Sequence, residues 1–216
     1  MNTTNTNTNT TTTENAPPGP TYSGEKFSCI LADPPWGNPG QKGKYGAANH
    51  YKLMSIERIA AMPIGALAAD NAHLYLWCYP AVRRVAEEVM EGYGFRFVDE
   101  FVWGKDQMGL GQYFRHAHET LLLGVKGKLP VKFRGQRSFA MLPRQDHSHK
   151  PEEVLTALIP RLSPGPYLEL FARRPTPGWK KWGNEVESDI VIPGYPVPSD
   201  RLHAADRAAA EEAHHA

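Results

Sequence analysis

An acid, two prolines and a tryptophan follow directly on an apolar stretch, at Asp33-Pro34-Pro35-Trp36. The two proline rings fix φ and remove two backbone N–H donors, so this turn is stiff. We expect its carbonyl groups to point outward as unpaired acceptors beside the Asp33 carboxylate. Two fixed acceptors could hold an amino group that has two N–H donors, and the Trp36 indole could stack on a heteroaromatic ring. The tetrapeptide therefore indicates a pocket for the exocyclic amine of a base.

The chemistry suited to such a pocket is alkylation of a weak nitrogen nucleophile. Adenine N6 is a poor nucleophile because its lone pair is delocalised into the ring. Two fixed acceptors would favour a more pyramidal nitrogen and hold it in line with an electrophile, which is catalysis by positioning and electrostatics. The structural alternative is a proline turn capped by Asp33, with Trp36 packed in the core.

Basic residues gather in a second stretch. Between residues 121 and 150 the sequence has seven lysines and arginines against one acid, Asp146, although the formal net charge of the chain is only +1. Local positive charge of this kind could contact phosphate groups. The alternative is a solvated loop.

The elements that must position these residues alternate between strands and helices. We expect strands at residues 27–32, 72–78, 95–103, 119–125 and 167–172. We expect helices at 55–62, with Ser55 as N-cap, at 82–90, ended by Gly92 and Gly94, and at 152–162. This alternation predicts an α/β three-layer sandwich. Asp33 would then lie at the carboxyl end of a strand, where ligands bind in such sheets.

Composition limits the class of protein. The chain has 216 residues, 41% hydrophobic and 22% charged, which suits one domain with tails. We expect a disordered tail over residues 1–22, a domain over 23–192 and a C-terminal tail over 193–216. No apolar run approaches the ~20 residues of a membrane span, and the start lacks the features of a signal peptide. The two cysteines, Cys29 and Cys78, lie in apolar runs, which favours a reducing cytoplasm over export.

The segment ADPPW after a strand resembles motif IV of the MT-A70 family of S-adenosylmethionine-dependent adenine-N6 methyltransferases. Further segments resemble the family in the same order: HYKLMSIERI, HLYLWCYP, GFRFVDEFVWGKD, HETLLLGVKGK, SHKPEEVLTALIPRLSPG, LELFARR and GWKKWGNEV. Together they cover roughly Phe27 to Val186. The resemblance implies a Rossmann-like methyltransferase fold in permuted order, with the catalytic motif before the cofactor elements. The chain has no G-x-G-x-x-G segment, which argues against a dinucleotide site.

The resemblance also implies roles for residues around the turn. Asp33 and the Pro34 carbonyl would grip adenine N6, Pro35 belongs to the same catalytic turn, and Trp36 would stack on the base. Asp33 and Lys150 would lie near the amino-acid end of S-adenosylmethionine, where Lys150 could pair with the methionine carboxylate. The structural alternative for Lys150 is a lysine at the start of a helix in a basic loop.

Four residues near the end of the domain resemble cofactor-binding positions of the family. Glu169 would hold the ribose side of the cofactor, and an acid on a buried strand needs a partner. Arg173 could be that partner and resembles a cofactor-binding arginine; the alternative is a buried Glu–Arg pair with no ligand. Asn184, with Glu185 beside it, matches a position that contacts the cofactor adenosine, although Asn184 alone would be an ordinary turn residue.

Three substrate-side residues complete the expected site. Tyr51 would border the methyl-transfer site or pack at its rim. His116 and Glu119, within Arg-His-Ala-His-Glu, would contact the substrate, with Glu119 near the target base. That segment could also be an acid–base cluster or a set of metal ligands, but no nearby acid or cysteine completes a metal set, so we expect no metal.

Two departures from the family pattern are visible. Residues 174–177, Arg-Pro-Thr-Pro, stand where the family commonly has a His-Asn pair on the cofactor ribose. The acid that members often carry upstream of the motif for the cofactor adenine has no counterpart here. Both departures concern the affinity for the cofactor.

The function that we expect is methyl transfer from S-adenosylmethionine to N6 of adenine in DNA. The alternatives are an RNA adenine-N6 methyltransferase and a catalytically silent nucleic-acid-binding partner of such an enzyme; intact Asp33 and Trp36 argue against the silent partner. DNA is preferred because compact members resemble microbial or phage DNA modifiers, which also places the protein in a microbial or phage-infected cytoplasm. A duplex target would have to be flipped out, and the Gly-rich stretch 37–50 suits a loop that closes over it. The oligomeric state stays open, with a homodimer or a heterodimer among the alternatives.

Overall fold

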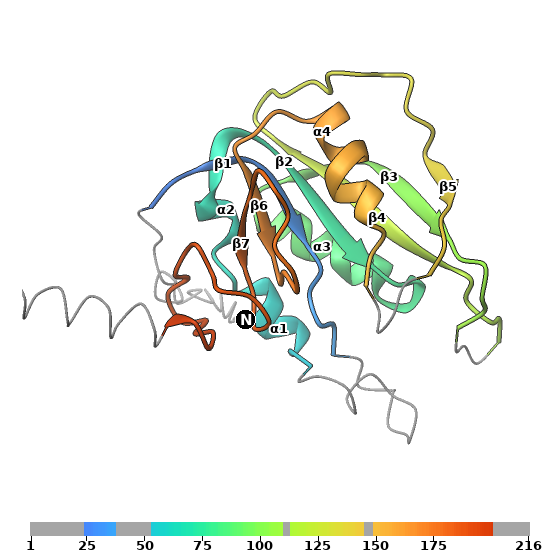
Figure 1. Ribbon diagram of the computed structural model, residues 1–216, viewed down its shortest axis with the longest axis horizontal. Helices are drawn as coiled ribbons and strands as arrows, with labels where there is room; N and C mark the ends of the chain where they lie inside the picture. The colour runs from blue at the N-terminus through green and yellow to red at the C-terminus, as the bar shows by residue number, and fades with distance from the viewer. Residues whose placement is uncertain (1–23, 38–52, 110–112, 145–148, 201–216) are drawn as a thin grey trace, which may run out of the picture.

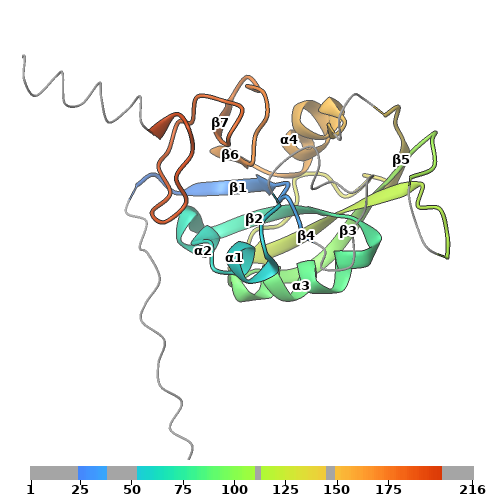
Figure 2. The ribbon, with the colours of Figure 1, turned by 90° about the horizontal axis from the view of Figure 1, so that it is seen from below.

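The computed structural model describes residues 24–37, 53–109, 113–144 and 149–200. These residues form a seven-stranded mixed sheet in the order β5-β3-β4-β2-β1-β6-β7, with helices on both faces (Figures 1 and 2). The strands are β1 (Phe27–Ala32), β2 (Ala68–Cys78), β3 (Arg96–Gly104), β4 (His118–Lys126), β5 (Phe139–Met141), β6 (Tyr167–Leu170) and β7 (Trp179–Trp182). The helices are α1 (Ile56–Ala60), α2 (Ile64–Leu67), η2 (Pro80–Val82), α3 (Arg83–Gly92), η3 (Val154–Leu158) and α4 (Ile159–Leu162).

Strand direction decides which ends of the strands meet. β1 pairs in parallel with both β2 and β6, so that Ile30 lies between Leu74 and Leu168. β4 is antiparallel to both of its neighbours, β2 and β3. β3 therefore runs in the same direction as β1, and the connection from β3 to β4 emerges at the edge where β1 and β6 end.

Alternating side chains of the strands build two cores, one on each face of the sheet. Ile30 of β1 packs in the core that α1, α2 and α3 cover. Its neighbours Cys29 and Leu31 point to the opposite face, where Val154 and Ile159 of the η3–α4 helix pack over them. Figure 2 shows these helices on opposite sides of the sheet. The three-layer α/β prediction is confirmed.

The expected helix over 152–162 forms, but its middle turn is π-helical. Pro160 lacks the N–H that an α-helix would donate to the carbonyl of Thr156, so the hydrogen-bond ladder shifts at this point. The helix at 55–62 is shorter than expected, and Ser55 caps it by accepting from the Arg58 N–H at 3.2 Å.

Packing continues past residue 192, where we expected a tail to begin. Tyr195 and Val197 are buried in the same core as α1. The Tyr195 hydroxyl donates to the Arg58 carbonyl at 2.8 Å, and the Arg58 guanidinium lies 4.8 Å from the centre of the Tyr195 ring. The division into 1–22, 23–192 and 193–216 stays a prediction. Within the described ranges no helix is long and apolar enough to cross a bilayer.

Candidate active site

Asp33 lies directly after β1 and is tied to the neighbouring strand, because its N–H donates to the Leu170 carbonyl at 3.4 Å. Lys150, at the start of the segment that leads into the η3–α4 helix, places Nζ 2.7 Å from Asp33 Oδ2 and 3.2 Å from Glu119 Oε2. The other oxygen of Glu119 accepts from Lys105. The four side chains form a row of alternating charge, Lys105–Glu119–Lys150–Asp33, that joins β3, β4 and β1.

Burial and charge act against each other in this row. Burial disfavours the ammonium of Lys150, but Asp33 and Glu119 outweigh it and raise the pKa of Lys150 above its usual value. Burial would raise the pKa of Glu119, but Lys150 and Lys105 lower it below its usual value. For Asp33 burial dominates and raises the pKa, with Lys150 opposing the shift. The site therefore holds a firmly charged lysine beside an acid that accepts a proton more readily than usual.

The carbonyl groups of the proline turn are not the unpaired acceptors that we expected. The Pro34 oxygen accepts from the Trp36 N–H at 2.8 Å, and the Pro35 oxygen accepts from the Met54 N–H at 2.9 Å. The expectation fails because the chain returns beside the turn at Met54 and forms a bridge with Trp36. A carbonyl oxygen has two lone pairs, so Pro34 keeps one acceptor position.

Trp36 packs inside the molecule. Its side chain is in the core on the α1 face, the residue is only 5% exposed, and its indole N–H donates to the Trp77 carbonyl at 2.8 Å. A ring in this setting offers no open face for the base stacking that the sequence predicted. Its evident part in the site is to anchor the rigid turn to β2.

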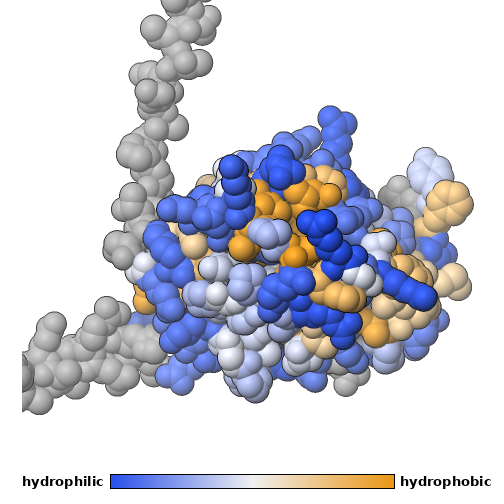
Figure 3. All heavy atoms as spheres, turned by 90° about the horizontal axis from the view of Figure 1, so that it is seen from above, coloured by the Kyte–Doolittle hydropathy of each residue, from blue (hydrophilic) through white to orange (hydrophobic). Residues whose placement is uncertain are grey.

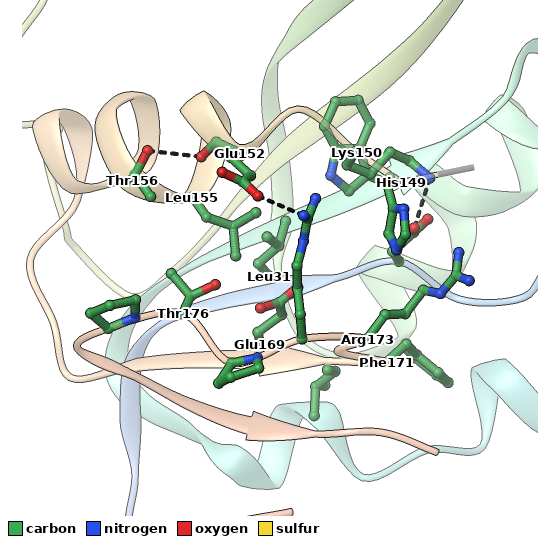
Figure 4. Close-up of a pocket in the computed structure, with 16 residues that line it drawn as sticks. Leu31, His149, Lys150, Glu152, Leu155, Thr156, Glu169, Phe171, Arg173 and Thr176 are labelled. Carbon is green, nitrogen blue, oxygen red and sulfur yellow. Dashed lines mark hydrogen bonds and ion pairs between the residues drawn. The ribbon is translucent and has the colours of Figure 1, made fainter. Parts of the chain in front are cut away.

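A pocket that is partly open to solvent lies where β1 and β6 end and the η3–α4 helix begins. Figure 4 shows Lys150, Glu169 and Arg173 beside this space, from three different segments of the chain. The lining combines charged residues with apolar ones: Asp33, Lys150, Glu152, Glu169, Arg173 and Arg174 among the first, Leu31, Trp77, Leu155 and Phe171 among the second.

Glu169 is the most unusual group in this pocket. It faces Leu31 in the β1–β6 register, its Oε2 atom is buried, and that atom has no hydrogen-bond partner among the described residues. Burial, together with the charge of Asp33, raises the pKa of Glu169 to about 7, with Arg174 opposing. An unsatisfied buried oxygen at the wall of a pocket is an acceptor for a ligand hydroxyl.

The ion pair that we expected between Glu169 and Arg173 is wrong. Arg173 Nε instead lies 2.8 Å from Glu185 Oε1. The reason is the backbone: Phe171 has φ 64°, so the chain turns sharply after β6 and Arg173 leaves the alternation of the strand. Arg174 Nη1 pairs with Glu152 Oε1 at 2.6 Å and so links this turn to the start of the η3–α4 helix.

The other predicted site residues differ in whether the structure places them at the site. Glu119 belongs to the site through its two lysines, whereas His116 is half-buried in the connection from β3 to β4. Asn184 is exposed just after β7, next to Glu185. Tyr51 lies outside the described residues. The sequence analysis did not identify Lys105. It could have been found from its position directly after β3, because β3 pairs with the strand that carries Glu119.

Comparisons with known proteins agree on one family. The profile of the MT-A70 family matches residues 27–185. The chain is 34% identical to the N(6)-adenine-specific methyltransferase METTL4 of Mus musculus over 185 residues, 76% of this chain and 38% of that protein. It is 27% identical to the Type II methyltransferase M.MunI of Mycoplasma sp over 197 residues, 81% of this chain and 84% of that enzyme. The match to the N(6)-adenosine-methyltransferase catalytic subunit METTL3 of Homo sapiens, at 29% identity, covers 75% of this chain and 28% of that protein. The matches thus span well under half of METTL4 and METTL3.

Proposed function

The chain belongs to the MT-A70 family, and from this membership we propose that it transfers a methyl group from S-adenosylmethionine to N6 of adenine in DNA. One observation carries the proposal. The same pocket has the Asp33–Lys150 pair, at 2.7 Å, on one side and the unsatisfied Glu169 carboxylate on the other. A nucleophile-positioning acid and a hydroxyl-accepting acid thereby line one pocket, in which the substrate base and the cofactor would meet.

The residues fit the proposed cofactor. The free Oε2 atom of Glu169 would accept from a ribose hydroxyl, and the charged Lys150 would attract the methionine carboxylate. Leu31 and Leu155 supply apolar surface between these polar groups. Arg174 lies where the family commonly has its His-Asn pair, and we propose that it contacts the same ribose side. Bound in this pocket, S-adenosylmethionine would supply a methyl group on a sulfonium that leaves as a neutral thioether.

Asp33 would position the nitrogen that attacks. Its carboxylate accepts one N–H of adenine N6, and the second lone pair of the Pro34 oxygen accepts the other. As the new N–C bond forms, positive charge develops on the nitrogen, and the Asp33 carboxylate stabilises it. The surplus proton can then pass to an Asp33 oxygen, which suits an acid whose pKa is raised. Lys150 holds Asp33 in one orientation throughout.

DNA is the preferred polymer. The match to the Type II methyltransferase of Mycoplasma sp spans 84% of that enzyme, and the sequence motifs resemble those of compact microbial and phage DNA modifiers. RNA is the alternative, because the METTL3 relative is named for adenosine methylation. Trp36 enters this proposal as the anchor of the turn, and Tyr51 as a neighbour of the target base.

The test is methyl transfer from labelled S-adenosylmethionine to oligonucleotides of DNA and RNA, each single- and double-stranded. Asp33→Asn is the test variant, because it keeps the shape of the side chain and removes its charge. We expect incorporation into DNA by the wild type, a loss of roughly 100-fold or more with Asp33→Asn, and N6-methyldeoxyadenosine after digestion to nucleosides. Equal incorporation by the two proteins would contradict the proposal, and methyladenosine only in RNA would favour the alternative.

A further inference from the structure

A hairpin arm extends from the sheet between β3 and β4. We define it by residues 105–109 and 113–117. Its base is closed by the Lys105 N–H, which donates to the Ala117 carbonyl at 2.8 Å, and by the Gly109 N–H, which donates to the His116 carbonyl at 2.7 Å. Because β3 runs parallel to β1, the arm leaves the sheet at the same edge as Asp33.

The arm exposes large apolar side chains. Tyr113 is 95% exposed, Phe114 82% and Met108 71%. Phe139 and Met141 of β5 add half-exposed apolar surface beside the base of the arm, where their side chains lie against Gly104. Figure 3 shows apolar side chains on the side of the molecule where β5 and the arm lie, with hydrophilic ones between them. Several large apolar side chains on one exposed surface are unusual and mark a site of interaction.

Cations lie among these aromatics. The described residues of the arm and residues 142–144 directly after β5 have three lysines and arginines, Lys105, Arg115 and Arg144, against one acid, Asp106. Lys105 is paired with Glu119. Exposed cations that accompany the aromatics include Arg115 on the arm and Arg144 after β5. Aromatic rings among arginines are the combination that binds single-stranded nucleic acid, because bases stack on the rings and phosphates meet the cations.

The arm is also joined to the proposed active site. Lys105 at its base binds Glu119, and Glu119 binds the Lys150 that holds Asp33. A polynucleotide whose target base reached Asp33 would therefore have its neighbouring nucleotides near the arm. The row of alternating charges fixes the base of the arm relative to Asp33.

We propose that Tyr113 and Phe114 are the stacking platform of this protein for the unpaired nucleotides that flank the target adenine, with Arg115 on the adjacent phosphate. This inference rests on the proposed function. It deepens it by naming the surface that holds the strand and the form of substrate that the surface fits, a locally single-stranded one. The positive charge favours this occupant over a second copy of the chain, which would bring the same charges face to face.

The first experiment measures binding of the full chain to a fluorescein-labelled single-stranded DNA of 15 nucleotides with one central adenine. The Tyr113→Ser/Phe114→Ser double variant should bind about 10-fold or more weakly, the scale of one or two lost stacking contacts. Arg115→Gln should weaken binding and reduce the salt slope by about one. Val191→Ser, which alters an exposed apolar residue elsewhere, is the control and should bind as the wild type does.

The second experiment separates stacking from a general loss of affinity. The bases next to the target are replaced by abasic positions, in a cycle with the double variant. If the rings stack on these bases, the wild type loses about 10-fold on the abasic strand and the double variant loses little more. Independent, additive losses would overturn the proposal, as would unchanged binding by the double variant.

Two other occupants would also appear as contrary results. A wild type that sediments as a dimer, with a double variant that sediments as a monomer, would assign the surface to a second copy. Binding of anionic vesicles by the wild type but not by the double variant would assign it to a membrane. These results are distinct from a failure of the proposed function. Stacking in the abasic cycle without any methyl transfer would refute the proposed enzyme activity and support the stacking platform. Methyl transfer that the double variant preserves at the same KM would support the enzyme activity and refute the platform.

Discussion

Two acids in the pocket, Asp33 and Glu169, differ in whether a neighbouring group stabilises their negative charge. Asp33 has a lysine 2.7 Å away, whereas Glu169 has a buried oxygen with no partner among the described residues. Burial raises the pKa of both, but the cation beside Asp33 opposes the shift at close range. Asp33 is thus held as a carboxylate by its lysine, whereas Glu169 has an oxygen that can accept a hydrogen bond from a ligand hydroxyl.

Glu169→Gln should make the empty protein more stable at pH 8 by roughly 1–3 kcal/mol. The pKa of Glu169 is about 7 in the fold against 4.5 in the unfolded chain, so the folded state holds its proton more tightly. The stability that this proton contributes is complete below pH 4.5 and is lost as the pH rises toward 7. Urea unfolding at pH 5 and pH 8 measures the effect, and the exposed Glu187→Gln is the control.

The same variant should bind S-adenosylmethionine more weakly, and its affinity should not vary with pH. In the wild type we expect the affinity to rise between pH 6 and pH 8, as Glu169 ionises and becomes a better acceptor. Isothermal titration calorimetry across this range is the measurement. A wild-type affinity that stays flat with pH would separate Glu169 from the cofactor.

Lys150→Met should cost about 3–5 kcal/mol of folding stability near neutral pH, because Asp33 and Glu119 would lose the cation between them. The cost should shrink at pH 4, where the carboxylates take up protons. Lys150→Arg keeps the charge and should recover much of the loss, while Lys180→Met on the exposed side of β7 should change little. Denaturation curves of the four proteins at the two pH values decide this.

At the scale of elements, the central strands and the helix over 152–162 were predictable because their apolar periodicity is strong. β5 and β7 were not predicted: β5 has three residues, two of them exposed, and β7 reads Trp-Lys-Lys-Trp. Such strands exist because a neighbouring strand offers hydrogen bonds, which is tertiary information. The turn after β6 was missed for a similar reason, since nothing in the residue type of Phe171 announces its φ of 64°. That one dihedral is why the Glu169–Arg173 prediction failed.

The end of β7 packs unusually close to this turn, and a glycine makes that packing feasible. A Cβ at Gly183 would come within 2.2 Å of the Ala172 carbonyl oxygen. Gly183→Ala should therefore destabilise the fold by about 1–3 kcal/mol and weaken cofactor binding by displacing Arg173 and Arg174. Gly92→Ala, where a Cβ would meet nothing within 4 Å, should be neutral or slightly stabilising. Thermal unfolding compares the pair; equal effects would contradict the packing argument.

At the scale of the whole molecule, the segment after β7 closes the core that α1 covers. Ile192, Tyr195 and Val197 are buried there, and Tyr195 binds α1 through the Arg58 carbonyl. The chain thus joins its late residues to a helix that follows the proline turn. We predicted a tail for this segment because its prolines and apolar residues show no helical or strand periodicity.

Tyr195→Ala should lower the free energy of unfolding by about 3 kcal/mol, since a buried aromatic ring and one hydrogen bond are lost. Val191→Ala, at an exposed position of the same segment, should stay within about 0.5 kcal/mol of the wild type. Chemical denaturation gives both values. A Tyr195→Ala protein as stable as the wild type would show that the segment is dispensable for the fold.

The reversed direction of β4 has a consequence for how such a protein can diversify. The antiparallel pair lets the chain leave the sheet at the same edge as Asp33 and return without a covering helix, so the hairpin arm is an insertion that is held only at its two ends. Doubling the length of such a loop costs only about 0.6 kcal/mol in closure entropy. Relatives could therefore exchange the arm for one of another length and composition, and change the sequence context of their target, while the cofactor half of the sheet stayed as it is.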